Sequence, residues 1–375
     1  DSLWAAVTPQ GPELPELIGT LQADVIVIGA GFTGLSTALH LREAGVDVVC
    51  IDRDPPVNQL TQKYDGRTTA ISYVSHQVLQ TAGVWEKMLP DCEPILDIRV
   101  ADGTSQLYLH FASEEDGNGR PFGWIIENRL MRHALFENAK RLKKHVRHLA
   151  PAEIKKFIRE KNAVGVVLKD GTKITAPLMV GADGRTSATR DWLGIDIKKS
   201  DYKQSAIVCN VAHAQDHENV AVEHFLPAGP FAVLPMTKSP SGEHRSSIVW
   251  TEHGGDAEKI LKLPPEDFDA RLQMLFGPHL GAVHHVSKPM SYPLGLMHAD
   301  TYIGNRVALM AEAAHVIHPI AGQGLNLSMR DVAVLTELIV DHLRLGLDIG
   351  SETLLKNYEA ARRSDTLLMA GVTDI

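Results

Sequence analysis

Hydrophobic runs and helical spacing alternate at the start of the chain. Residues 23–29 (ADVIVIG) and 47–52 (DVVCID) are nearly continuous apolar runs, which are typical of strands buried on both faces of a parallel sheet. Between them, residues 33–44 have the spacing of a helix, and Gly45 gives that helix an end. The pattern predicts a βαβ unit with a right-handed crossover. Residues 1–22 lack any period, so we expect an extended arm there.

The next part of the chain predicts helices and then a hairpin. Helical spacing recurs at residues 72–82 and 129–141. Residues 163–181 contain strand-like runs on both sides of Asp170-Gly171, a dipeptide that favours tight turns. This segment ends in a short apolar run (LMVG). We therefore expect a β-hairpin that leads into another buried strand.

The pattern changes between residues 201 and 299, where short alternating strands predict an antiparallel sheet in an α+β arrangement. The expected strands are residues 205–211, 221–226, 231–236 and 246–251. An apolar strand at 306–310 and a long helix at about 325–345 follow, and the tail keeps a helical pattern. The sequence thus predicts an α/β part that is interrupted by a second, sheet-based part.

Composition narrows the class of protein without choosing a function. The 375 residues are 44% hydrophobic and carry a net charge of -9, so the chain lacks the basic excess expected of a nucleic-acid-binding protein. Cys50, Cys92 and Cys209 are far apart and have no metal-binding spacing. Neither a membrane-length apolar run nor a signal-like segment occurs. We expect a cytoplasmic protein without a metal, and peripheral contact with a membrane stays open.

Residues 29–34 (GAGFTG) form a GxGxxG motif between a predicted strand and a predicted helix. Gly29 permits the tight turn, Gly31 lets the backbone approach a pyrophosphate, and Gly34 allows helix and strand to pack closely. The N-terminus of the helix offers free N–H groups to phosphates. Asp52 ends the next strand, where a carboxylate binds ribose hydroxyls and disfavours NADP. The motif predicts a bound FAD or NAD.

Two later segments bear on the choice between FAD and NAD. The first is residues 181–187 (GADGRTS). In the second, residues 311–326, an acid (Glu312) stands at a strand end and a Gly-rich turn leads into the long helix. Such a helix N-terminus can stabilise the negative charge that a flavin ring gains on reduction. These segments favour FAD.

With these motifs the chain resembles the para-hydroxybenzoate hydroxylase-like superfamily of FAD monooxygenases, whose patterns are a GxGxxG loop, a DG motif and a GD motif. The chain matches the DG motif at Asp183-Gly184 but has Ala311-Glu312 in place of Gly-Asp. A more specific resemblance, covering about residues 23–370, is to the ubiquinone-biosynthesis flavoprotein hydroxylases. It rests on residues 65–71 (DGRTTAI), 126–130 (IENRL), 229–235 (GPFAVLP) and 318–331 (HPIAGQGLNLSMRD).

The resemblance implies an FAD-binding Rossmann-like domain with three ββα layers, formed by residues 1–200 and 300–345. It also implies an antiparallel-sheet α+β substrate domain at residues 201–299 and a helical tail at residues 346–375, which we expect to be truncated. FAD contacts are expected at Gly29, Gly31, Phe32, Thr33, Gly34, Asp52, Arg53, Arg67, Asn128, Asp183, Gly184, Glu312, Pro319, Gly322, Gly324, Leu325 and Asn326.

Several of these residues have other interpretations. Arg67 could be a solvated loop charge, Asn128 a helix N-cap and Asp183 a turn former. His315 and His318 are weak candidates for acid–base catalysis because histidine titrates near neutral pH. Satisfying the hydrogen bonds of a loop is the more common role of such residues. The other histidines are expected at the surface.

The resemblance implies an enzyme that uses FAD, NAD(P)H and O₂ to hydroxylate an aromatic ring, with a polyprenylated phenol of ubiquinone biosynthesis as the substrate. A second GxGxxG motif is missing, so NAD(P)H would bind transiently. Two alternatives stay open. One is a different FAD oxidoreductase, such as an epoxidase or an oxidase. The other is an FAD-binding subunit of a biosynthetic complex with little activity of its own.

Overall fold

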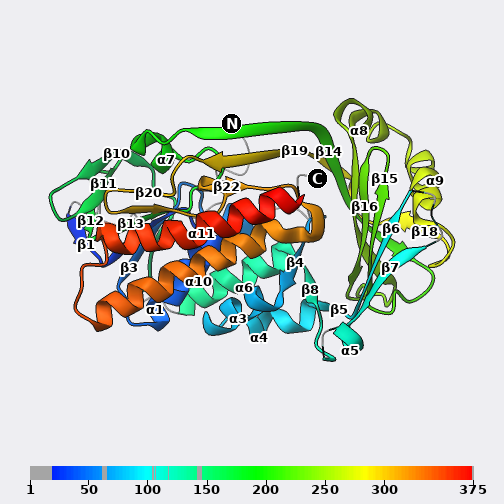
Figure 1. Ribbon diagram of the computed structural model, residues 1–375, viewed down its shortest axis with the longest axis horizontal. Coiled ribbons are helices and arrows are strands. Elements are labelled where there is room, and N and C mark those ends of the chain that lie inside the picture. Colours follow the sequence, from blue (N-terminus) through cyan, green and yellow to red (C-terminus); the bar gives the residue numbers. More distant parts are fainter. Residues whose placement is uncertain are drawn as a thin grey trace, which may run out of the picture.

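The computed structural model of the protein describes residues 19–60, 66–103, 105, 107–116, 118–141 and 146–373. Figure 1 shows a helix-covered body with a large sheet at one end, and two long strands run between them. The arm expected at residues 1–22 lies mostly outside the described residues. Its described end forms β1 (Thr20–Gln22), which pairs in parallel with β12 (Lys173–Ala176).

A six-stranded sheet lies at the centre of the body. Its strands are β2 (Val25–Ile28), β3 (Val48–Ile51), β9 (Val146–Leu149), β13 (Leu178–Gly181), β20 (Ile303–Gly304) and β21 (Val307–Leu309). Their order is β20-β21-β13-β2-β3-β9, and every pair except β20–β21 is parallel. The predicted βαβ unit is confirmed, because α1 (Phe32–Glu43) joins the neighbouring strands β2 and β3.

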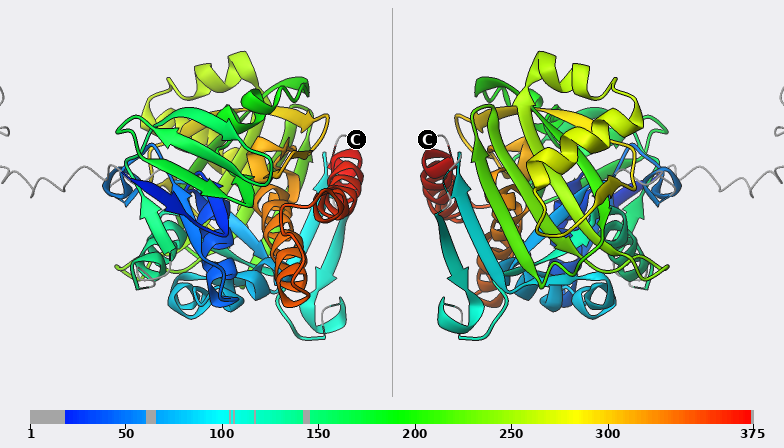
Figure 2. Two further views of the ribbon diagram at one scale, coloured as in Figure 1. Left: turned by 90° about the vertical axis from the view of Figure 1, so that its left-hand side faces the viewer. Right: turned by 90° about the vertical axis from the view of Figure 1, so that its right-hand side faces the viewer.

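Different layers cover the two faces of this sheet. On one face, a four-stranded sheet adds β11 (Val164–Leu168) and β10 (Ile154–Arg159) to β1 and β12, so the predicted hairpin is β11–β12. Ile26 of the central sheet packs against Val166 and Ile174 of this layer. The other face packs against helices (Figure 2). The expected ββα layering is thereby confirmed.

The helices of the body come from all parts of the chain. The longer ones are α3 (Tyr73–Thr81), α6 (Asn128–Arg141), α10 (Gln323–Arg344) and α11 (Glu352–Thr373). The shorter ones are α2 (Pro56–Leu60), α4 (Trp85–Met88), α5 (Ser113–Asp116) and α7 (Ala188–Leu193). In Figure 1, α11 lies along α10, and α10 in turn packs against α1. The helical pattern of the tail is confirmed by α11.

The second sheet has nine strands and is mostly antiparallel. They are β6 (Asp97–Asp102), β7 (Tyr108–Ala112), β14 (Ile197–His213), β15 (Val220–Leu226), β16 (Gly229–Met236), β17 (His244–His253), β18 (Val283–His285), β19 (Met290–Ala299) and β22 (His315–Val316). The order is β22-β19-β14-β17-β16-β15-β6-β7, and β18 pairs with β14. The four predicted strands are present, and the first is part of the 17-residue β14.

The two faces of the nine-stranded sheet have different surroundings. Helices α8 (Gly254–Ile260) and α9 (Pro265–Phe276) cover the outer face, where Val233 packs against Leu272. The opposite face, which we call the inner face, carries Ala221, which belongs to the same apolar cluster as Ile125. Ile125 belongs to a small sheet of β4 (Thr68–Ser72), β8 (Gly123–Glu127) and β5 (Glu93–Ile95). This small sheet lies between the body and the large sheet (Figure 1).

Candidate functional site

The glycine loop connects β2 to α1, and its three glycines have different surroundings. Gly29 has φ +99°, and a Cβ there would lie 2.4 Å from the carbonyl oxygen of Ala182. A Cβ at Gly34 would lie 1.9 Å from the carbonyl oxygen of Gly29. The fold itself therefore requires these two glycines. A Cβ at Gly31 would meet no atom of the described chain within 4 Å, so the backbone is open there.

Helix α1 begins directly at this open point. Gly31 is its N-cap residue and supplies no side-chain hydrogen bond to the first turn. Phe32 is the first helical residue, and Thr33 is buried, with its carbonyl accepting a hydrogen bond from the Thr37 hydroxyl at 2.8 Å. An uncapped N-terminus beside an open backbone suits a phosphate group, because N–H donors and the positive end of the helix dipole point at it.

Asp52 follows β3 and lies beside the glycine loop. Its Oδ2 accepts a hydrogen bond from the Ala30 N–H at 2.5 Å, and its Oδ1 accepts one from the Asp54 N–H at 2.8 Å. The structure thus brings the acid and the loop together, 22 residues apart in sequence. The neighbouring Arg53 has a side chain that is 77% exposed. An acid at the end of the second strand is where dinucleotide-binding folds bind a ribose hydroxyl.

Asp183 and Gly184 follow β13, the strand next to β2. The Asp183 carboxylate accepts hydrogen bonds from the Ser187 hydroxyl and from both the N–H and the hydroxyl of Thr189, at 2.9 and 3.0 Å for Thr189. These bonds organise the start of α7, so the side chain has a clear structural role. Gly184 has φ +80°, and a Cβ there would meet no atom of the described chain within 4 Å. Backbone at this turn, rather than the Asp183 carboxylate, is free to face a ligand.

The segment after Asp183 is joined to the segment around Glu312. The buried Arg190 donates hydrogen bonds to the carbonyls of Ala313 (3.1 Å) and Arg185 (2.9 Å). Arg185 also forms a half-exposed ion pair with Glu312, at 3.0 Å between Nε and Oε1. Two motifs that are about 130 residues apart in sequence therefore meet at one edge of the parallel sheet. Arg190 was absent from the expected site residues.

The turn before α10 combines a left-handed backbone at a glycine with an open helix end. Gly322, which has φ +63°, is the N-cap residue of α10 and provides no side-chain cap. A Cβ at Gly322 would come within 2.9 Å of the Ala70 Cβ, whereas one at Gly324 would meet nothing within 4 Å in the described chain. Pro319 precedes this turn, and Leu325 packs against the core of the body. Like the glycine loop, this helix N-terminus is accessible to a negatively charged group.

Asn326 lies in the same turn, but its side chain is saturated by the protein. Its Oδ1 accepts hydrogen bonds from the Ser72 N–H (2.9 Å) and the Ser75 hydroxyl (2.7 Å). Its Nδ2 donates to the carbonyls of Ala70 (2.9 Å) and Gly322 (3.0 Å). The amide therefore joins α10 to β4 and α3. It sets the position of the turn through these bonds, and its four hydrogen-bonding positions are already used.

Arg67 and Asn128 lie at the ends of β4 and β8. The Asn128 N–H donates to the Arg67 carbonyl at 3.0 Å, and its side-chain oxygen accepts from the Thr69 hydroxyl. The Arg67 guanidinium lies 5.4 Å from the centroid of the Tyr292 ring, on the inner face side of β19. Asp65 of the same motif lies outside the described residues. Asn128 starts α6, and its side chain serves β4 rather than capping that helix.

His315 and His318 have partners that favour structural roles. His315 is 3% exposed, and its Nε2 lies 2.7 Å from Oδ2 of Asp331. His318 accepts a hydrogen bond from the Ile320 N–H at 3.2 Å and packs edge-on against Tyr202. We expected His315 in a loop, but it lies in strand β22.

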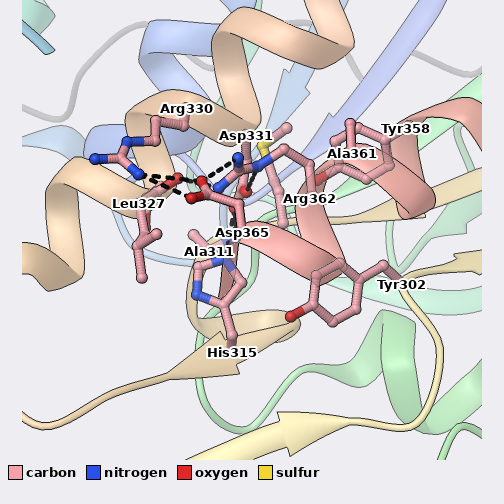
Figure 3. Close-up of polar contacts among 12 residues, drawn as sticks. Tyr302, Ala311, His315, Leu327, Arg330, Asp331, Tyr358, Ala361, Arg362 and Asp365 are labelled. Carbon is pink, nitrogen blue, oxygen red and sulfur yellow. Dashed lines mark hydrogen bonds and ion pairs between the residues drawn. The ribbon is translucent and has the colours of Figure 1, made fainter. Parts of the chain in front are cut away.

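Asp331 is the centre of a buried network that sequence reasoning missed (Figure 3). Besides His315, its carboxylate accepts hydrogen bonds from the Ala311 N–H at 2.8 Å and from Nε of Arg362 at 2.6 Å. Burial alone would raise the pKa of Asp331, but hydrogen bonds and electrostatic attraction from His315 and Arg362 outweigh it, so that the pKa lies below its usual range.

The network stabilises the backbone of the Glu312 turn. Ala311 has φ +54°, a conformation that L-residues rarely adopt and that the bond to Asp331 helps to hold. Arg362 comes from α11 and also donates to the Leu327 carbonyl at 3.3 Å. The signal in the sequence was a lone acid on an apolar helical stripe, because Leu327, Asp331 and Leu335 are spaced four residues apart.

The expectation that the other histidines lie at the surface is wrong for three of them. His213, His217 and His298 are less than 9% exposed. His213 donates a hydrogen bond from Nδ1 to the Gln215 carbonyl, and its Nε2 lies 2.9 Å from the Ser246 hydroxyl oxygen. Nε2 of His298 lies 2.9 Å from the Tyr302 hydroxyl oxygen. These residues lie on or beside the long strands β14 and β19, whose burial a local pattern does not reveal.

The glycine loop, the acid after β3 and the two helix N-termini define a dinucleotide-binding flavoprotein. Residues 22–367 match the family model described as FAD binding domain. The chain is 47% identical to the ubiquinone hydroxylase UbiL of Rhodospirillum rubrum over 352 residues, which cover 94% of this chain and 80% of the relative. It is 33% identical to the ubiquinone hydroxylase UbiM of Neisseria meningitidis over 344 residues, covering 90% and 73%.

The fold has solved counterparts. The structure of PqsL from Pseudomonas aeruginosa in complex with 2-aminobenzoylacetate superposes with a TM-score of 0.78 at 22% identity, covering 94% of this chain and 95% of the other. The chain belongs to the FAD-binding-domain family and, within it, to the family of the ubiquinone hydroxylases. FAD is its cofactor. The resemblance inferred from the sequence motifs is confirmed.

Proposed function

We propose that the protein is an FAD-dependent hydroxylase that adds oxygen to the aromatic ring of a polyprenylated phenol in ubiquinone biosynthesis. The observation that carries this proposal is the 47% identity to a ubiquinone hydroxylase along 94% of the chain. With NAD(P)H and O₂, the bound FAD would supply the reactive oxygen, while the protein holds the ring and excludes water.

The FAD would be held by three parts of the chain. We propose that Gly31 and the first turn of α1 bind the pyrophosphate and that Asp52 binds a ribose. The backbone at Gly184 and the carboxylate of Glu312 would contact the chain between phosphates and flavin. The N-terminus of α10 at Gly324 would face the flavin ring. The open backbone at Gly31 and Gly324 supports this assignment, because the chain leaves room at these points.

The two large sheets belong to parts of the chain with different proposed roles. We propose that residues 1–200 and 300–345 form the FAD-binding domain and that residues 201–299 form the substrate domain, to whose sheet β6 and β7 contribute. The inner face of that sheet would carry the substrate. It adjoins the body where the Thr68 hydroxyl donates to the Ser247 hydroxyl at 2.8 Å.

An apolar edge supports a lipid-tailed substrate and contact with a membrane surface. Leu107, Leu109 and Phe111, on and beside the edge strand β7, are 84%, 65% and 42% exposed. Among the described helices, none is long and apolar enough to cross a bilayer. We propose that this edge touches lipid. Replacing Leu107 and Leu109 by Ser should reduce co-sedimentation with phospholipid vesicles, while Leu347→Ser, which changes another exposed leucine, should not.

The hydroxylase proposal is tested with purified, FAD-loaded protein. A prenylated phenol should accelerate NAD(P)H oxidation, and ¹⁸O from labelled O₂ should appear in the ring of the product. Peroxide formation without NAD(P)H would indicate an oxidase. If the protein binds FAD but oxidises no NAD(P)H with any phenol, the result would favour the role of a low-activity subunit.

A further inference from the structure

Glu223 lies in the middle of β15, on the inner face of the nine-stranded sheet. Side chains alternate between faces along a strand. The neighbours of Glu223 show which face it occupies: Val222 packs into the outer cluster with Phe231, and Ala221 packs into the inner cluster with Ile125. Glu223 therefore projects from the same face as Ala221.

The row of residues across the sheet from Glu223 is apolar. The register places Ala232 of β16 on one side of it and Val100 of β6 on the other. Beyond Ala232 the row continues with Val249 of β17 and Val208 of β14. A carboxyl group is unfavourable in such a row, because placing its charge among apolar neighbours costs free energy.

The carboxyl of Glu223 has no partner in the described part of the chain. Neither a hydrogen bond nor an ion pair joins it to a described residue, and burial is the one cause that raises its pKa to about 7. Glu127 shows what the fold does with a structural acid: it is 4% exposed and pairs with Arg129 at 2.6 Å and with Arg245 at 3.2 Å. Glu223 lacks this compensation, which costs stability unless a ligand provides a partner.

Glu223 also lies near the proposed flavin turn. Ser247 of β17 contacts Thr68, and β4, which Thr68 begins, contacts Gly322 through Ala70. β15 is two strands from β17, which corresponds to about 10 Å. An aromatic ring with its substituents can span much of that distance. A ring lying on the inner face can therefore approach the flavin turn and present a hydroxyl to Glu223.

We propose that Glu223 binds the ring hydroxyl of the phenolic substrate. This inference rests on the proposed hydroxylase function. The carboxylate accepts a hydrogen bond from the phenolic O–H, which fixes the ring on the inner face and increases its electron density for oxygen transfer. The hydroxyl in turn gives Glu223 the hydrogen-bonding partner that the apolar residues of the row do not provide. A charge-assisted bond of this kind is stronger and more selective than one between neutral groups.

The test compares ligand binding by the wild type with that by Glu223→Leu and Glu223→Gln, all loaded with FAD. Leu removes the acceptor and suits the apolar row, whereas Gln keeps a neutral acceptor. The probes are a short-chain prenylated phenol and its methyl ether, which has no hydroxyl to donate. Their dissociation constants come from the change in flavin absorbance. Glu258→Gln on α8, an exposed site on the outer-face side, is the matched control.

We expect Glu223→Leu to weaken phenol binding at least tenfold and Glu223→Gln to weaken it severalfold, with little change for the methyl ether. FAD content and unfolding midpoint verify that each variant is folded. Equal effects on both probes, or none on either, would overturn the role of Glu223. If the wild type holds FAD but binds neither probe, the proposed function fails as well. If the wild type and the Glu223 variants bind the phenol equally tightly, only the role of Glu223 fails.

Discussion

The fold withdraws Asp331 fully and Glu223 partly from solvent, and it gives these two acids opposite surroundings. Asp331 is 0% exposed and is surrounded by donors, and its pKa lies below the usual range because His315 and Arg362 stabilise its charge. Glu223 lies among apolar side chains, and burial raises its pKa to about 7. The carboxylate of Asp331 is satisfied by the chain, and the carboxyl of Glu223 has no partner among the described residues.

The difference indicates which acid serves the fold and which is available to a ligand. Asp331 joins α10, the Ala311 turn and α11, so that it holds together the backbone on which the proposed flavin site depends (Figure 3). In the described part of the chain, no side-chain bond of Glu223 links one element to another. An ionisable group that is shifted by desolvation alone and lies beside a proposed site is a candidate for function.

Removing the charge of Asp331 should produce the largest effect. Asp331→Asn leaves the 4%-exposed Arg362 with a weaker partner, and loss of one member of a buried pair typically costs about 3 kcal/mol or more. We expect the free energy of unfolding in urea to fall by about that amount, together with a loss of bound FAD. Asp341→Asn, on the exposed side of α10, is the control. If the two variants were equally stable, the network would not support the fold.

Glu223 should make stability depend on pH. The pKa of its carboxyl is 4.5 in the unfolded chain and about 7 in the fold. Between these values the folded state alone holds the proton, so the free energy of unfolding falls as pH rises from about 4.5 to 7 and is then constant. Allowing for partial exposure, we expect a loss of roughly 2 kcal/mol. Glu223→Gln should not show this loss.

The measurement is urea unfolding of the wild type and Glu223→Gln at about pH 5 and about pH 8, the two sides of the shifted pKa. The difference between the two proteins isolates Glu223 from other titrating groups. Glu258→Gln should follow the wild type at both pH values. A constant difference between the wild type and Glu223→Gln would show that the carboxyl is stabilised after all, and the contrast with Asp331 would disappear.

Gly31 is a position where substitution should change the affinity for FAD without changing the stability of the fold. Gly31→Ala adds a Cβ where the described chain leaves open space, and its φ of -71° suits alanine. We expect stability without FAD to be unchanged and FAD affinity to fall about tenfold, or about 1.4 kcal/mol, because the Cβ occupies the approach of the pyrophosphate. Gly255→Ala on α8 is the control. Unaltered FAD affinity in Gly31→Ala would place the phosphates elsewhere.

Local patterns in the sequence predicted the body of the fold well. The apolar runs at 25–28 and 48–51 and the turn at Asp170-Gly171 depend on neighbouring residues, and they became the expected strands and hairpin. The pairing of β6 with β15 joins residues more than 120 apart. A long-range pairing of this kind is not encoded in a local period, which explains why β6 and β7 were missed.

The prediction of the site from the sequence was limited in a similar way. Motifs pointed to Gly31, Asp52 and Glu312 as candidates, but a motif does not show what each residue contacts. Asp183 and Asn326 fit the family pattern, yet their side chains are engaged by Thr189 and by Ser75 and Ala70, respectively. Glu223 belongs to no motif. Its environment depends on three strands that are brought together only in the folded sheet.

Substitution of Glu312 should have the smallest effect on stability. Glu312 lies between the two kinds of acid, because it has a partner in the chain and is also proposed to contact FAD. Its ion pair with Arg185 is half exposed, so Glu312→Gln should change stability by less than about 1 kcal/mol. If its carboxylate contacts FAD as proposed, FAD affinity should nevertheless fall severalfold, and Glu312→Asp should fall between Gln and the wild type. FAD titration beside urea unfolding measures both quantities. Arg185→Gln, which breaks the same ion pair, separates the two roles: an equal loss of FAD affinity there would mean that Glu312 acts only through Arg185.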